Sequence, residues 1–295
     1  MKKVIYKGSG VAIVTPMNED SSINYEELGK LIDWQIDEGT DCIIICGTTG
    51  ESTVMGDEEH VECTDFAVKR AAGRVPVIAG CGSNDTGYAI WLSEEAKKSG
   101  ADGLLHVTPY YNKTSQKGLI AHFNAIADAT DLPVVLYNVP SRTGMTIQPN
   151  TYLELSRHPN IVATKEANGD VASCARTMAL CGDNLAFYSG NDDMVVPLMS
   201  IGGIGVISVA ANIMPKEISA MCRLFLDGDI RGAAELQIKL MGIIDALFCD
   251  VNPIPVKAAL RLMGKAVGPC RMPLVEMSDS GLEQLRGQLK KHNLI

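Results

Sequence analysis

A single lysine interrupts an otherwise apolar segment of the sequence. Lys165 lies in the run IVATKEA at residues 161–167, and lysine is rarely buried without a reason. Its amino group could reach solvent at the end of a strand, or it could pair with Glu166. Alternatively, apolar surroundings would disfavour the ammonium form, and a neutral amine can attack a ketone to form a Schiff base. The residues alone leave these alternatives open.

Hydroxyl groups follow three other apolar runs. The motif GTTGES at residues 47–52 sets Thr48 and Thr49 between glycines, which predicts either a backbone nest for a carboxylate or phosphate or an ordinary tight turn. Tyr110 and Tyr111 follow a second run, and Tyr137 lies near the end of a third. Tyrosine at a strand end is usually a packing residue, but several at one site can pass protons.

Eight short apolar runs alternate with segments of helical periodicity. The runs span residues 10–16, 42–47, 75–80, 101–109, 132–140, 160–167, 185–190 and 204–212. They are apolar on both faces, which is typical of buried parallel strands. Eight such units predict an α/β fold of the closed TIM (β/α)8 barrel type. An open doubly wound sheet is the alternative, but it usually shows GxGxxG after its first strand, whereas KGSG at residues 7–10 precedes the first run.

The C-terminal part of the sequence contains helical segments and no further strand. Segments 229–249, 255–264 and 279–292 predict helices. We therefore predict a catalytic barrel over residues 1–228 and a C-terminal helical domain over residues 229–295. This appendage should pack on the barrel, because no linker rich in proline, glycine or serine separates the two. In such a barrel the site lies at the C-terminal ends of the strands, where the lysine and the hydroxyl groups fall.

Composition excludes several classes of partner. The chain has 295 residues and a net charge of −9, which argues against nucleic-acid binding. Its nine cysteines include no CxxC pair, which predicts reduced thiols and a cytoplasmic location. The five histidines show no ligand spacing, so we expect no metal site. No apolar stretch of about 18 residues occurs, so we expect no membrane partner.

Together these motifs resemble the pyruvate-dependent class I aldolase family, which includes the dihydrodipicolinate synthases and the N-acetylneuraminate lyases. The resemblance covers nearly the whole chain and rests on GTTGES (47–52), VTPYYNKTSQKGL (107–119), YNVPSRTG (137–144), Lys165, SGND (189–192) and NPIPVK (252–257). It implies that Lys165 condenses with pyruvate and that the resulting enamine attacks L-aspartate 4-semialdehyde. The product would be 4-hydroxy-tetrahydrodipicolinate, at the first committed step of diaminopimelate and lysine biosynthesis. No separate cofactor is implied, because the lysine–pyruvate Schiff base is the electron sink.

The resemblance also assigns roles to the hydroxyl groups. Thr49, helped by the backbone of Thr48, would hold the carboxylate of pyruvate. Tyr137 would be the proton donor and acceptor nearest the imine, and the Thr48 hydroxyl would link it to Tyr111. In this family that last tyrosine reaches into the site of a neighbouring subunit, which implies a dimer as the smallest active unit and commonly a homotetramer of two dimers.

Three further positions carry over from the family pattern. Gly190 and Ile207 would line the pyruvate pocket through their backbone groups. Arg142 would bind the carboxylate of the aldehyde, because its planar fork of donors suits bidentate recognition. This arginine favours the synthases over a retro-aldol lyase of a sugar acid, of the N-acetylneuraminate or 2-keto-3-deoxygluconate type. A non-catalytic barrel that senses a keto acid is an alternative of another class.

Some family members are inhibited by L-lysine at the dimer interface. The matching positions here are Ser52, Thr53, Asp57, His60, Asn84, Tyr88 and Tyr110. Asp57 stands where sensitive bacterial enzymes commonly have histidine, and Tyr88 stands where a glutamate meets the lysine ammonium. Loss of that carboxylate removes a contact of about 1.5–3 kcal/mol. We therefore predict weak or absent feedback by lysine.

Overall fold

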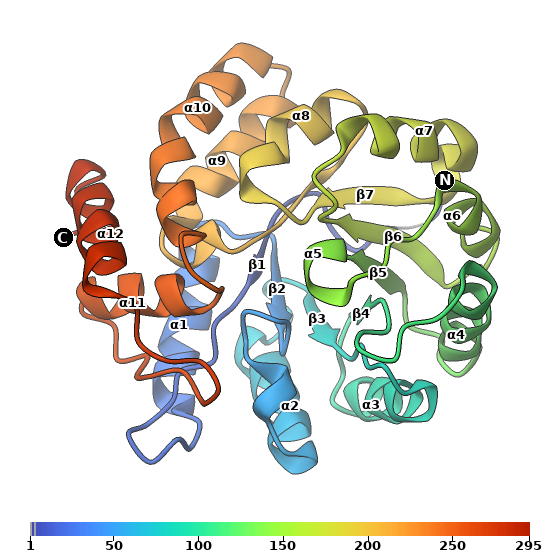
Figure 1. The fold of residues 1–295 in the computed structure, drawn as a ribbon, viewed down its shortest axis with the longest axis horizontal. Coiled ribbons are helices and arrows are strands. Elements are labelled where there is room, and N and C mark those ends of the chain that lie inside the picture. The colour runs from blue at the N-terminus through green and yellow to red at the C-terminus, as the bar shows by residue number, and fades with distance from the viewer. Residues whose placement is uncertain (1, 3) are drawn as a thin grey trace.

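Eight parallel strands close a barrel in the order of the sequence. The computed structural model describes residue 2 and residues 4–295. Each strand pairs with the next, and β8 pairs with β1, so that the strands form a central ring with helices around it (Figure 1). The predicted (β/α)8 barrel is confirmed, and an open sheet is excluded.

The strands and helices alternate along the chain up to β8. The strands are β1 (Gly8–Ala12), β2 (Cys42–Ile45), β3 (Val77–Gly80), β4 (Gly103–Val107), β5 (Val134–Asn138), β6 (Ile161–Glu166), β7 (Ala186–Ser189) and β8 (Gly205–Ser208). The helices are α1 (Tyr25–Asp37), α2 (Asp57–Ala71), α3 (Thr86–Lys98), α4 (Gln116–Asp128), α5 (Pro140–Thr143), α6 (Pro149–Leu155), α7 (Val171–Cys181), α8 (Val195–Ser200), α9 (Pro215–Leu226), α10 (Ile230–Leu247), α11 (Ile254–Leu262) and α12 (Asp279–Lys291). Short 3-10 turns are η1 (Ser52–Val54), η2 (Gly182–Asn184), η3 (Asp192–Met194) and η4 (Ala210–Asn212).

Successive residues of each strand point alternately into the barrel and toward the helices. Inward residues such as Ile44 and Val135 form one buried cluster, and their neighbours Ile43 and Val134 belong to a second cluster under the helices. Both faces are therefore buried, which explains why the strands appear in the sequence as continuous apolar runs. Each run overlaps one strand.

The first strand begins earlier than the sequence predicts. Residues 7–10 were expected to precede it, but β1 starts at Gly8. Gly8 and Ser9 pair with β8, and the Ser9 N–H donates to Asp41 Oδ2 at 2.8 Å. A Cβ atom at Gly10 would lie 2.3 Å from the Tyr6 hydroxyl. Neighbouring groups approach the backbone of Gly8 and Gly10 too closely for a side chain, so glycine suits these two strand positions.

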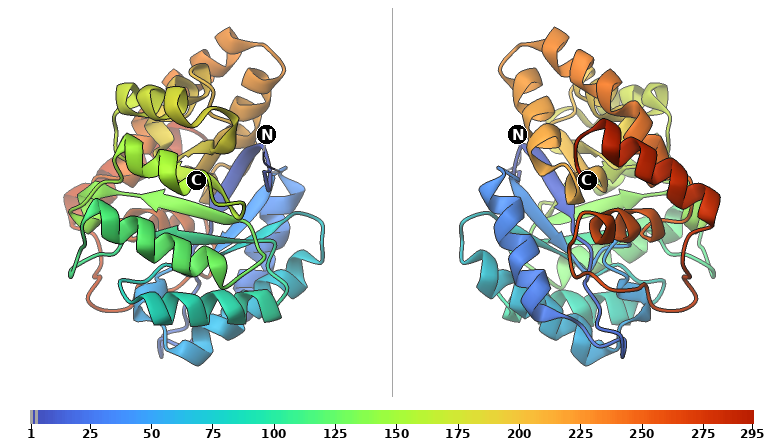
Figure 2. Two further views of the ribbon diagram at one scale, coloured as in Figure 1. Left: turned by 90° about the vertical axis from the view of Figure 1, so that its right-hand side faces the viewer. Right: turned by 90° about the vertical axis from the view of Figure 1, so that its left-hand side faces the viewer.

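The C-terminal helices pack on the barrel rather than extending from it. Helix α10 packs against α9 and α12, and α12 packs against α11. Figure 2 shows α11 and α12 together on one side of the molecule. The Ala266 N–H donates to Glu27 Oε1 of α1 at 3.0 Å. The packing that the sequence predicts is confirmed, whereas the division of the chain at residue 228 stays a prediction. Among the described residues, no helix has both the length and the apolar character that crossing a bilayer requires.

Candidate active site

Lys165 is buried in the barrel near the C-terminal end of its strand. It is the fifth residue of β6, is only 5% exposed, and stands in register with Tyr137 of β5. Its Nζ atom lies 4.3 Å from the centroid of the Tyr137 ring. Among the described residues it has no hydrogen bond or ion pair, so the alternatives of a solvent-exposed amine and of pairing with Glu166 are both wrong.

Glu166 points away from the lysine because the side chains of adjacent strand residues alternate. Its Oε1 accepts from Asn138 Nδ2 at 2.8 Å, and its Oε2 accepts from the Tyr152 hydroxyl at 2.8 Å. Burial raises the pKa of this carboxyl to about 7, against the opposing effect of these donors. Glu166 therefore belongs to the packing between the strands and the helices and does not neutralise Lys165.

The backbone approaches the lysine closely just after β7, and a residue of β8 is buried inside the barrel. A Cβ atom at Gly190 would lie 3.1 Å from Lys165 Cγ and 2.7 Å from Ala167 Cβ, so a side chain there would displace the lysine. Ile207 of β8 is fully buried in the inner cluster. That these two residues line the pyruvate pocket stays a prediction.

Asp192 holds the ends of β7 and β8 together. Its carboxylate accepts hydrogen bonds from the Ser208 hydroxyl and from the N–H groups of Val209 and Ala210. Burial raises the pKa of this carboxyl, and these donors, with the nearby charge of Lys165, oppose the rise. The sequence analysis assigned Asp192 no role, although it is a charged residue between two apolar segments.

The motif GTTGES forms a turn that leaves donors free. The Gly50 N–H donates to Gly47 O and the Glu51 N–H to Thr48 O, but the N–H groups of Thr48 and Thr49 donate to no acceptor among the described residues. Neither threonine hydroxyl donates to a local carbonyl there, contrary to the tight-turn alternative. Thr48 and Tyr137 line the same cavity of about 60 Å³. The turn therefore offers free donors, and its role as a carboxylate nest stays a prediction.

Tyr111 does not reach the site of its own chain. It lies in the loop after β4, its side chain is 94% exposed, and its φ angle is +65°, a region that non-glycine residues rarely adopt. One chain thus brings together Tyr137 and Thr48 at a shared cavity and directs Tyr111 outward. The three-residue relay is not closed within a single chain.

Arg142 lies at the rim on the single-turn helix α5. Its guanidinium is exposed, and Nη2 donates to the backbone carbonyl of Asn252 at 3.0 Å. The side chain of Asn252 in turn donates to Thr49 Oγ1 at 3.0 Å. The residues expected to receive the two substrate carboxylates are therefore joined by one residue of the C-terminal part.

Sequence reasoning missed the role of the segment around Asn252. Lys257 of α11 pairs with Glu51 of the GTTGES motif at 2.8 Å, and both side chains are inaccessible to solvent. The sequence feature that could have pointed to this segment is the presence of two polar residues, Asn252 and Lys257, in the otherwise apolar motif NPIPVK. Their partners lie more than 200 residues away in the chain, so the sequence alone could not identify them.

The positions that match the lysine-binding site of some relatives lie around the starts of α2 and α3. The Tyr88 hydroxyl donates to Asp57 Oδ1 at 2.7 Å, and burial, followed by this bond, raises the pKa of Tyr88 to about 12. His60 Nε2 contacts Gly80 O at 2.8 Å, and burial lowers its pKa. Asn84 O accepts from Asn112 Nδ2 at 2.9 Å. Asp57 and Tyr88, the two residues that depart from the sensitive pattern, are therefore hydrogen-bonded to each other. The remaining positions are Ser52 and Tyr110, which are half-buried, and Thr53, which is exposed.

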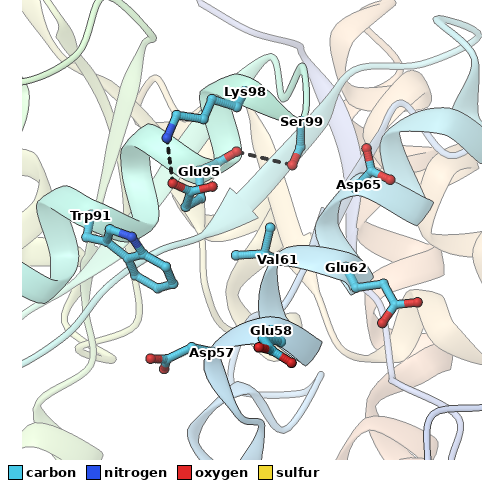
Figure 3. Close-up of a pocket in the computed structure, with 9 residues that line it drawn as sticks. All are labelled: Asp57, Glu58, Val61, Glu62, Asp65, Trp91, Glu95, Lys98 and Ser99. Atoms are coloured by element: carbon cyan, nitrogen blue, oxygen red, sulfur yellow. Dashed lines mark hydrogen bonds and ion pairs between the residues drawn. The ribbon is translucent and has the colours of Figure 1, made fainter.

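A larger hollow of about 610 Å³ separates α2 from α3 and is distinct from the barrel mouth. Figure 3 shows acidic side chains of α2 on one side and Trp91, Glu95 and Lys98 of α3 on the other. Lys98 is bound to Glu95 at 2.6 Å. This acidic lining repels the carboxylates of keto acids, so the hollow is not the substrate site.

His106 contributes to packing. Burial lowers the pKa of His106 to about 3, and its Nε2 contacts Ser93 Oγ at 3.1 Å beneath α3. His106 is therefore a neutral core residue. Among the described residues there is no group of three or more histidine, cysteine, aspartate or glutamate side chains placed to bind a metal.

Comparison with known proteins finds relatives over nearly the whole chain. A relative from Thermoanaerobacter sp. (strain X514), named 4-hydroxy-tetrahydrodipicolinate synthase, is 55% identical over 292 residues and covers 99% of this chain and 98% of its own. The chloride-inhibited dihydrodipicolinate synthase from Acinetobacter baumannii, solved with pyruvate, is 43% identical with a TM-score of 0.97, over 99% of this chain and 100% of that one. The enzyme from Cyanidioschyzon merolae, solved with lysine bound, is 41% identical with a TM-score of 0.96, over the same shares of the two chains.

The model of the dihydrodipicolinate synthetase family matches residues 5–292. The match spans the barrel, the GTTGES turn, the lysine of β6 and the C-terminal helices. The chain therefore belongs to the dihydrodipicolinate synthetase family.

Proposed function

We propose that this chain condenses pyruvate with L-aspartate 4-semialdehyde to give 4-hydroxy-tetrahydrodipicolinate, in the diaminopimelate route to lysine. Relatives at 50–55% identity carry the name of that synthase, and no finding favours a lyase of sugar acids. The observation that carries the proposal is Lys165, a buried amine without a described hydrogen-bond partner, beside the hydroxyl-bearing ring of Tyr137.

The covalent chemistry belongs to the lysine and the substrate. Lys165 Nζ attacks the keto carbon of pyruvate, and loss of water leaves an imine. Tyr137 passes protons to and from the leaving oxygen and the methyl carbon, which becomes an enamine. The enamine carbon attacks the aldehyde carbon, whose oxygen takes up a proton. The amino group of the second substrate then displaces the lysine from the imine carbon. The imine is the electron sink, so the reaction needs no separate cofactor.

The two carboxylates are received by two different groups, which Asn252 joins. The Thr49 hydroxyl and the free N–H groups of Thr48 and Thr49 hold the carboxylate of pyruvate, which leaves the Thr48 hydroxyl to the relay. The guanidinium of Arg142 binds that of the aldehyde with two parallel hydrogen bonds. The backbones of Gly190 and Ile207 close the pocket around the keto acid.

The complete relay requires a second chain. We infer that Tyr111 completes the relay of a neighbouring subunit, with the dimer as the smallest active unit and two dimers forming a homotetramer. The exposed side chain and positive φ of Tyr111 support this inference, because strained residues persist where function or assembly requires them. A cytoplasmic location is part of the same proposal, since all nine cysteines are free thiols.

Borohydride reduction in the presence of pyruvate tests the covalent step. The expected result is a mass increase on the peptide that contains Lys165, in addition to turnover of aspartate semialdehyde in a coupled assay. Reversible binding of pyruvate without a trapped adduct would instead identify a keto-acid sensor and refute the enzyme.

The substitution R142A tests the choice of second substrate. Turnover of aspartate semialdehyde should fall by about 10- to 100-fold, because a charge-assisted contact is lost. The pyruvate adduct on Lys165 should form as in the wild type. If aldehyde turnover is unchanged, Arg142 does not bind that substrate.

A further inference from the structure

Asn252 lies between the two carboxylate-binding groups proposed above. It precedes α11, it is only 6% exposed, and it reaches the barrel from a segment 203 residues beyond Thr49. Its side-chain Nδ2 donates to Thr49 Oγ1, and its backbone carbonyl accepts from Arg142 Nη2, both at 3.0 Å. Its side chain and its backbone thus serve different partners.

The hydrogen bond to Thr49 determines what that hydroxyl can do. A threonine hydroxyl has one proton to donate and two lone pairs that accept. Because Asn252 donates to Oγ1, it occupies a lone pair and leaves the proton directed elsewhere. Among the described residues that proton has no acceptor. A carboxylate oxygen, which only accepts hydrogen bonds, is the partner that this orientation suits.

The amide of Asn252 is not explained by packing alone. Its Oδ1 is buried and has no hydrogen-bond partner among the described residues, which destabilises the fold. An apolar side chain of similar size would avoid this unpaired oxygen. The one side-chain hydrogen bond that Asn252 makes within the described part of the chain is the bond to Thr49, which points to a role in the site.

The segment that carries Asn252 is held rigidly against the same turn. Lys257 donates to Glu51 Oε1 at 2.8 Å and to Thr15 O at 3.2 Å. Glu51 Oε2 also accepts from the Arg271 N–H at 2.8 Å. The GTTGES turn and the start of α11 therefore form one unit, which fixes the amide relative to the threonine.

We propose that Asn252 is a positioning residue for pyruvate, whose side-chain amide orients the Thr49 hydroxyl as a donor to the substrate carboxylate. Its backbone carbonyl holds Arg142 at the same time and links the two carboxylate sites. This inference rests on the proposed function, since it concerns how the same site recognises its first substrate.

The substitution N252A separates the side-chain role from the backbone role. It removes the amide and keeps the carbonyl that holds Arg142. The KM for pyruvate should rise by about tenfold, whereas the KM for aspartate semialdehyde and kcat should stay within about twofold of the wild type. A general structural defect would change all three quantities together.

The isosteric substitution N252D reverses the direction of the hydrogen bond. A carboxylate cannot donate to Oγ1, so the Thr49 hydroxyl would donate to Asp and be lost to the substrate. The KM for pyruvate should therefore rise more in N252D than in N252A, although aspartate fills the space better than alanine. This variant also provides the test if N252A does not fold.

A double-mutant cycle with T49V shows whether Asn252 acts through the threonine. In the T49V background, N252A should leave the KM for pyruvate unchanged within about twofold, because the hydroxyl that it orients is already absent. Additive effects, or a wild-type KM for pyruvate in N252A and N252D, would overturn the inference. The wild type is assayed in parallel: if it forms no trapped adduct with pyruvate, the proposed function itself fails.

Discussion

Two lysines are buried among residue 2 and residues 4–295, and their surroundings differ. Lys257 is fully buried, and its three N–H bonds have three acceptors: Glu51 Oε1, Thr15 O and Pro269 O. Lys165 is almost as inaccessible, but it contacts the ring of Tyr137 and has no hydrogen-bond acceptor among the described residues. One lysine has the partners that a buried ammonium needs, whereas the other has an aromatic ring beside it.

If Lys165 forms the Schiff base as proposed, the difference means that burial alone does not identify a reactive lysine. Lys257 joins α11 to the GTTGES turn, and its hydrogen bonds leave it no chemistry to perform. The environment of Lys165 leaves its nitrogen available to an electrophile that enters the barrel. The criterion that separates them is the number of acceptors around each nitrogen.

The strongest test of the comparison is removal of the reactive amine. The substitution K165A should reduce kcat/KM by roughly 10⁴-fold or more, and the borohydride adduct should disappear. K290A, which removes an exposed lysine of α12, is the matched control and should retain both. Comparable turnover in K165A would mean that another group forms the bond.

Removal of the second lysine should affect stability instead. K257M breaks a buried ion pair and leaves Glu51 without its cation, so the free energy of unfolding should fall by about 3–5 kcal/mol in urea titrations. K165M should be close to the wild type in the same titration. Adding E51Q to K257M should recover part of the loss. Equal stability of K257M and the wild type would contradict the structural role.

The pH dependence of stability tests whether Glu166 is a buried carboxyl that no lysine neutralises. Burial raises the pKa of Glu166 to about 7, above its ordinary value near 4.5. The folded state therefore binds this proton more tightly than the unfolded state, and the stabilisation is lost as pH rises from about 4.5 to about 7. Unfolding of wild type and E166Q across this range should diverge, with the wild type losing stability relative to E166Q. Parallel curves would show that Glu166 titrates normally.

The smallest expected effect is that of added free L-lysine on turnover. Glu51 receives the ammonium of Lys257, but Tyr88 offers no carboxylate, and its hydroxyl is bound to Asp57. Added L-lysine should leave turnover nearly unchanged, and Y88E should increase inhibition. Half-inhibition of the wild type at a low lysine concentration would refute this prediction.

The sequence was sufficient for the features that depend on local pattern. Runs that are apolar on both faces indicate barrel strands, and Lys165 is recognised because it is a charged residue within such a run. The bond between Asn252 and Thr49 could not be predicted, because it joins segments that only the closed barrel brings together. The early start of β1 at Gly8 was also missed, since it depends on pairing with β8 and not on the apolarity of residues 8–10.

The outward position of Tyr111 has a consequence for measurements on dilute samples. Under the shared-site proposal, each separated chain lacks the last member of its proton relay. Specific activity then depends on protein concentration and falls as subunits dissociate by mass action. Rates compared between laboratories, or between variants that associate differently, have meaning only at stated enzyme concentrations.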